Sequence, residues 1–114
     1  MPSDWNAGTI TAKFYWKHPA TATNFGVLWG LQGRAYADGD VLDATWGTIQ
    51  TAVDTGGATS AVYISPATAA ITIAGAPAAG QLVQLRIKRD PTDASDTLAV
   101  TADLLGVMLT FTRA

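Results

Sequence analysis

The chain contains no cysteine, and only one of its 114 residues is a histidine. Disulfides, thiolate nucleophiles and zinc sites with cysteine ligands are therefore excluded, and a metal cluster built from several histidines cannot form. Charged residues make up only 14% of the chain, and the formal net charge is -2. Because a net negative charge gives no general attraction to phosphate backbones, we expect no nucleic-acid partner.

Long apolar runs are also absent. The apolar stretches are far shorter than a membrane span requires, and the opening MPSDWNAG lacks the basic start and apolar centre of a signal peptide. We therefore expect a chain that is made in the cytoplasm and has no membrane partner.

Clear alternation of apolar and polar residues marks two segments, 9–17 and the run AGQLVQLRIKRDP at 79–91. In a strand, alternate side chains point to opposite faces, so this period of two predicts two half-buried strands. The inward residues are Ile10, Ala12, Phe14 and Trp16 in the first segment, and Val83, Leu85 and Ile87 in the second.

Further strands are expected at 25–37, 46–54, 61–65 and 70–74 and within 97–112, with a short helical turn at 40–45. In the last run the alternation changes phase near Leu105 and Gly106, which predicts a bulge or a change of sheet. About eight short strands without an amphipathic helix predict an all-β fold, an antiparallel β-sandwich of the jelly-roll kind. Residues 1–7 are interpreted as an N-terminal contact segment, and 8–114 as a single domain.

Aromatic residues are concentrated in the first strands. Phe14, Trp16 and Trp29 fall on inward positions, where their large apolar area favours a core role over a binding platform. The rings expected to be exposed are those of Trp5, Tyr15 and Tyr36, which are predicted to contact a partner protein because aromatic residues are enriched at interfaces. Trp5 is the predicted anchor of the contact segment.

An alternative use of the exposed aromatics is carbohydrate binding, since a ring face stacks on the apolar face of a sugar. The best candidate for such a platform is Tyr36 with Asp38 and Asp40.

Residues suited to catalysis are few. His18, at the end of a predicted strand, is interpreted as a partly exposed loop histidine, since no serine stands in a Gly-x-Ser-x-Gly context. Two acidic loops, 38–43 and 90–96, favour turn formation by aspartate over the alternative of calcium binding. We therefore expect no enzyme activity, no metal and no cofactor.

Three segments, DWNAGTITAKFYW, TNFGVLWGLQGRAYADGDVLDATWG and PATAAITIAGAPAAGQLVQLRIKRDPTDASDTLAVTADLLGVMLTFT, resemble a family of small virion proteins of tailed bacteriophages. The resemblance covers nearly the whole chain and implies a jelly-roll module that decorates the capsid or belongs to a head fibre or tail spike. It implies phage major capsid protein or other virion proteins as partners, assembly as a trimer, and location in the phage particle. The alternative within the family is a carbohydrate-binding receptor module on a fibre.

Overall fold

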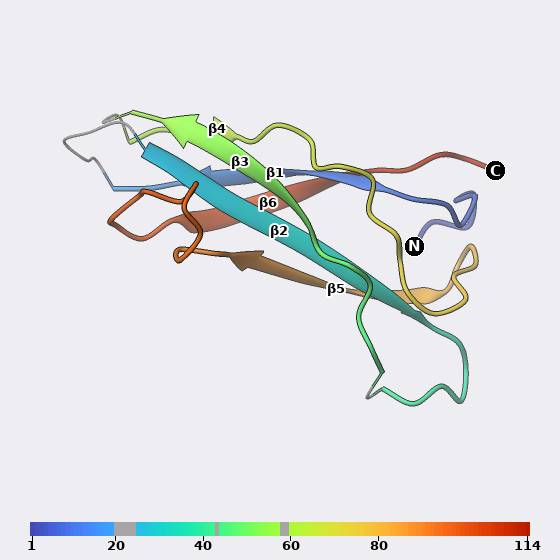
Figure 1. Ribbon diagram of the computed structural model, residues 1–114. Helices are drawn as coiled ribbons and strands as arrows, with labels where there is room; N and C mark the ends of the chain where they lie inside the picture. The colour runs from blue at the N-terminus through green and yellow to red at the C-terminus, as the bar shows by residue number, and fades with distance from the viewer. Residues whose placement is uncertain (20–24, 43, 58–59) are drawn as a thin grey trace.

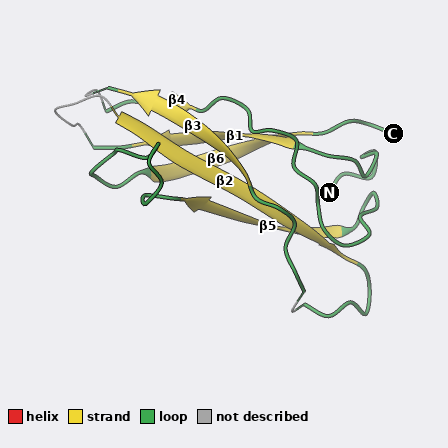
Figure 2. Ribbon diagram, in the orientation of Figure 1, coloured by secondary structure: helices red, strands yellow, loops and turns green. Residues whose placement is uncertain are grey.

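The fold is known from a computed structural model, which describes residues 1–19, 25–42, 44–57 and 60–114. These residues form six strands and no helix (Figure 2). The strands are β1 (Thr11–Lys17), β2 (Phe25–Tyr36), β3 (Gln50–Gly56), β4 (Tyr63–Ile64), β5 (Leu82–Arg89) and β6 (Asp103–Thr110). In the described part of the chain no helix is long and apolar enough to cross a membrane.

The strands form two antiparallel sheets with the orders β4-β1-β6 and β3-β2-β5. Aromatic side chains of β1 pack against those of β2, so the sheets lie face to face around one core (Figure 1). The predicted all-β sandwich is confirmed. Its described residues contain six strands rather than about eight, two fewer than a jelly roll has.

The two alternating segments form the predicted half-buried strands. Ile10 and alternate residues of β1 are buried, while in β5 the inward side chains are half-buried and the outward ones exposed. The predicted phase change is also confirmed. β6 pairs with β1 so that Tyr15 lies opposite Gly106 and Trp16 opposite Leu104, which leaves Leu105 as the extra residue of a bulge.

β2 is buried on both faces because two segments fold over its outer side: the loop around Ser95 over its start and the chain that follows β2 over its second half. The hydroxyl of Tyr36 donates to the carbonyl of Leu42 at 3.0 Å, and the amide of Gln32 donates to the carbonyl of Gly47 at 3.0 Å. Trp46 lies against the guanidinium of Arg86, 5.0 Å from ring centre to Cζ. Residues 44–49 thus cover the outer face of the second half of β2. They belong to the long connection between β2 and β3 at the lower right of Figure 1.

Several predicted boundaries in the middle of the chain are wrong. The strand expected at 46–54 is β3, which starts at Gln50 because the four residues before it lie over β2. The helical turn expected at 40–45 is not formed in its described residues; Asp43 lies outside them. Of the strand expected at 61–65 only β4 forms, and the one expected at 70–74 is reduced to isolated bridges.

The segment after β4 continues along β1 by using side chains in place of a strand. The N–H groups of Ser65 and Thr68 donate to carbonyls of β1, and their hydroxyls accept from the N–H groups of Phe14 and Ala12. Ile71 then pairs with Ile10 through two backbone hydrogen bonds. Because Pro66 has no N–H, a regular ladder cannot pass this point, and the hydroxyls satisfy the donors of β1 instead.

The N-terminal segment is part of the domain. Its Asn6 N–H donates to the carbonyl of Thr112, and Trp5 forms an antiparallel bridge with Arg113. Trp5, expected to be an exposed anchor, is only 1% exposed and belongs to the core. Because Trp5 pairs with the C-terminal end of the chain, its ring is held in the core.

We predict that Trp5→Ala destabilises the isolated protein. Removing a buried tryptophan costs roughly 3–5 kcal/mol through lost burial and the cavity left behind. Urea unfolding followed by circular dichroism measures this loss. An unchanged unfolding midpoint would contradict the burial of Trp5.

Thr68→Val should also destabilise the protein, because valine has the shape of threonine but leaves the buried N–H of Ala12 without its acceptor. The expected loss is about 1–3 kcal/mol of unfolding free energy. The matched control is Thr72→Val, since Thr72 is exposed. Equal stability of the two variants would count against the role of the Thr68 hydroxyl.

Candidate functional site

Exposed apolar side chains gather on the outer face of the β4-β1-β6 sheet. The register places Tyr15 of β1 beside Ile64 of β4 on one side and Gly106 of β6 on the other. The hydroxyl of Tyr15 lies 3.8 Å from the sulfur of Met108. We call this surface the outer stripe; it consists of Tyr15, Ile64 and Met108.

Lysines flank the outer stripe. Lys13 and Lys17 are on the same strand face as Tyr15, two residues before and after it, and Lys13 lies opposite Met108. A half-buried ring between exposed aliphatic side chains, with charges around it, has the composition of a protein contact surface with an apolar centre and a polar rim. Of the residues predicted to contact a partner, Tyr15 is the one placed on such a surface.

Tyr36, which was predicted to be exposed for a partner or a sugar, is buried. Its side chain is 6% exposed, its hydroxyl is bound to the Leu42 carbonyl, and the guanidinium of Arg34 lies over its ring at 5.8 Å. Asp40 accepts a hydrogen bond from the N–H of Ala37 and so closes a turn. The expected sugar platform of Tyr36, Asp38 and Asp40 therefore has no free ring face.

The aromatics assigned to the core lie between the sheets. Phe14 stacks on Trp29 with ring centres 5.9 Å apart, and Trp16 stacks on Tyr63 at 5.1 Å and meets Phe25 edge-on at 5.6 Å. The indole N–H of Trp16 donates to the carboxylate of Asp54 at 3.0 Å. Phe14, Trp16 and Trp29 are all buried.

His18 belongs to the same aromatic cluster. It is buried instead of partly exposed, because its ring lies between Phe25 and Tyr63 at the end of β1. Its Nδ1 contacts the carbonyl of Pro19. The sequence pattern missed this burial, since a histidine before a proline is typical of an exposed strand end.

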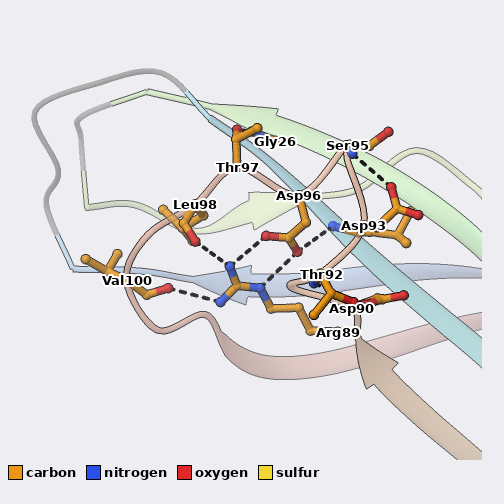
Figure 3. Close-up of polar contacts among 11 residues, drawn as sticks. Gly26, Arg89, Asp90, Thr92, Asp93, Ser95, Asp96, Thr97, Leu98 and Val100 are labelled. Atoms are coloured by element: carbon orange, nitrogen blue, oxygen red, sulfur yellow. Dashed lines mark hydrogen bonds and ion pairs between the residues drawn. The ribbon is translucent and has the colours of Figure 1, made fainter.

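The second acidic loop closes on itself and on the sheet (Figure 3). Asp90 accepts from the N–H and the hydroxyl of Thr92, and Asp93 accepts from the N–H of Ser95. These are the turn contacts that were predicted. Within the described residues no three His, Asp or Glu side chains come together as a possible metal site.

Asp96 joins this loop to β5 and β2. Its carboxylate accepts two hydrogen bonds from Arg89, at 2.8 and 3.0 Å, and one from the N–H of Leu28 at 3.1 Å. Arg89 also donates to the carbonyls of Leu98 and Val100. The Asp96 side chain is fully buried, and its charge is compensated by the guanidinium, which donates four hydrogen bonds to Asp96, Leu98 and Val100. Figure 3 shows this arrangement, which we call the Arg89–Asp96 clasp.

The pKa of Asp96 reflects both its burial and its partners. Burial raises the pKa, but the hydrogen bonds from Arg89 and Leu28 and the charge of Arg89 outweigh burial and hold the pKa below 3.8. The hydrogen bonds from Thr92 likewise lower the pKa of Asp90. Both carboxylates bind protons more weakly in the folded chain than in the unfolded one, so their stabilisation is complete above the ordinary pKa and is lost as the pH falls below it.

A shallow hollow of about 600 Å³ lies on the outer face of the other sheet, over the start of β2. Its walls include Val53 and Thr55 of β3 and Ser95 and Thr97 of the acidic loop. A Cβ at Gly26 would come within 2.5 Å of the Ser95 carbonyl, so glycine lets the loop close over β2. The Thr97 hydroxyl already accepts from the N–H of Gly26, and the lining side chains are uncharged and, apart from Phe25, small.

Comparisons with protein-family models, curated protein sequences and solved structures give no match for this chain.

Asp96→Asn should lower the unfolding free energy by about 3 kcal/mol at pH 7, because it leaves the Arg89 guanidinium largely buried without its counter-charge. Near pH 3 the deficit should shrink, because the carboxylate of the unfolded chain takes up a proton below about 3.8 while the native one, with its lowered pKa, resists it, so the unmodified chain loses stability that the asparagine variant never had. Urea unfolding at the two pH values measures both effects.

The matched control is Asp93→Asn, which alters an exposed turn in the same loop. It should cost less than about 1 kcal/mol. A deficit of Asp96→Asn that is the same at pH 7 and pH 3 would contradict the role of the charge.

Proposed function

We propose that this chain is a structural protein of a tailed-bacteriophage particle, which binds the capsid or a neighbouring virion protein through its outer stripe. The observation that carries the proposal is the exposed apolar surface around Tyr15. The sequence resemblance to small phage virion proteins supports the same role. Docking over a sheet face requires no pocket, and a contact repeated over a symmetric shell holds firmly even when each copy binds modestly.

The division of the aromatic residues supports a docking role for this face. Phe14 and Trp16 point from β1 into the core, whereas Tyr15 between them points outward, beside Ile64 and close to Met108. A tyrosine surrounded by aliphatic side chains and a methionine is the type of group that dominates binding energy at protein interfaces. The lysines beside it on β1 suit a partner surface that carries carboxylates at its rim.

Carbohydrate binding by a fibre module is less well supported. Its expected platform at Tyr36 is covered by Arg34 and bound to the loop. We therefore propose no glycan site.

Tyr15→Ala tests the docking face. Truncating a tyrosine at the centre of an interface costs about 2 kcal/mol or more, which corresponds to roughly 30-fold weaker binding. The measurement is co-sedimentation of the purified chain with phage particles that lack it, at several chain concentrations.

The control is Thr51→Ala, an exposed position on a strand of the opposite sheet, which should bind like the unmodified chain. Equal binding of both variants would rule out the outer stripe. Mass spectrometry of purified particles that finds no trace of the chain would overturn the virion role itself.

A further inference from the structure

β6 is an edge strand with an uncharged edge. One side of β6 pairs with β1, and no strand of the described chain pairs with its other side. After Asp103 its residues are Leu-Leu-Gly-Val-Met-Leu-Thr, without a charge or a proline. Exposed strand edges of this kind pair with other chains unless charges, prolines or bulges protect them.

The other edge strands are protected or short. β5 carries Arg86, Lys88 and Arg89, so pairing with a copy of itself would crowd cations. β3 holds the carboxylate of Asp54, which points inward to Trp16, and β4 has only two residues. Of these four edge strands, β6 is the one that is both longer than two residues and uncharged after its first residue.

The bulge at Leu105 limits the regular part of β6 to residues 106–110. This stretch is centred on Met108, with Gly106, Met108 and Thr110 on the outer face and Val107 and Leu109 on the inner face. When two such stretches pair antiparallel about Met108, outer residues meet outer residues and inner meet inner. A register shifted by one residue would break this match.

We propose that β6 pairs antiparallel with β6 of a second copy of this chain, centred on Met108, to form a symmetric dimer with a continuous six-stranded sheet. Charge supports the second copy as the occupant. The antiparallel direction keeps the two Asp103 carboxylates at opposite ends. Each is brought to the end of the other chain, where Arg113, which is exposed and pairs through its Nε with Asp4, adds a positive charge.

The pairing also covers apolar surface. Val107 and Leu109 are half-buried in one copy, and Met108 would lie against its own copy across the two-fold axis. The outer stripes of two copies would then lie on one continuous sheet. The dimer is a property of the isolated chain, so its test does not depend on the proposed virion role.

A single cysteine tests the register. The chain has no cysteine of its own. At a two-fold axis between antiparallel strands, the two Cα atoms of residue 108 lie about 4.5–5.5 Å apart, within the range that a disulfide needs. Met108→Cys should therefore form a disulfide-linked dimer under mild oxidation at about 100 µM chain, roughly tenfold faster than a control cysteine.

The control is Val53→Cys, because Val53 is 39% exposed and Met108 42%, and both lie on edge strands. Equal rates of cross-linking for the two variants would overturn the proposed pairing.

Sedimentation equilibrium of the unmodified chain gives a second readout. We expect twice the chain mass at about 200 µM, and a dissociation constant at least tenfold weaker for Met108→Lys than for Val53→Lys. A two-fold contact closes after two copies, whereas the resemblance to phage decoration proteins implies three. A monomer at every concentration up to about 1 mM, or a trimer, would overturn the β6 pairing.

Discussion

The packing of Trp16 between the two sheets is the interaction on which the rest of the structure depends. A three-stranded sheet with one apolar face must bury that face against another layer. Trp16 of β1 stacks on Tyr63 of β4 and meets Phe25 of β2, and its N–H donates to Asp54 of β3. One side chain thus touches both sheets, and its polar atom is satisfied inside the core. The aromatic side chains concentrated in the first two strands pack between the two sheets. Tyr15 is the aromatic residue of β1 that lies on the surface.

Short sheets leave many backbone groups without a strand partner, and this chain satisfies them with side chains. Ser65 and Thr68 bind the backbone of β1 where Pro66 prevents a regular ladder. Along the first half of β2, where β5 no longer pairs with it, the Asp96 carboxylate and the Thr97 hydroxyl accept hydrogen bonds from the N–H groups of β2. The Arg89–Asp96 clasp fixes the loop in this position. β6 is the contrasting case, because its free edge has no such cover in the described chain, and this difference is the basis for proposing that a second copy provides it.

Strands β1 and β5 and the bulge at Leu105 could be predicted, because a period of two and its change of phase are local properties of the sequence. The burial of Trp5 could not be predicted, since it depends on pairing with Arg113 at the other end of the chain. Tyr36 is covered by a loop whose path no local pattern indicates. The sequence indicated only part of the outer stripe. Tyr15 was signalled by its outward position in β1, whereas Ile64 and Met108 join it through a register that only the folded sheet defines.

The proposed docking face and the proposed dimer both require that the aromatics of β1 and β2 hold the sheets together. Equilibrium unfolding of Trp16→Ala tests this claim most directly. Loss of the buried ring and its hydrogen bond should remove about 3–5 kcal/mol of the roughly 5–15 kcal/mol that stabilises a domain. The urea midpoint should fall accordingly while the unfolding remains cooperative. A loss below about 1 kcal/mol would contradict the account, because a tryptophan that lines an open site can be removed at little cost to the fold.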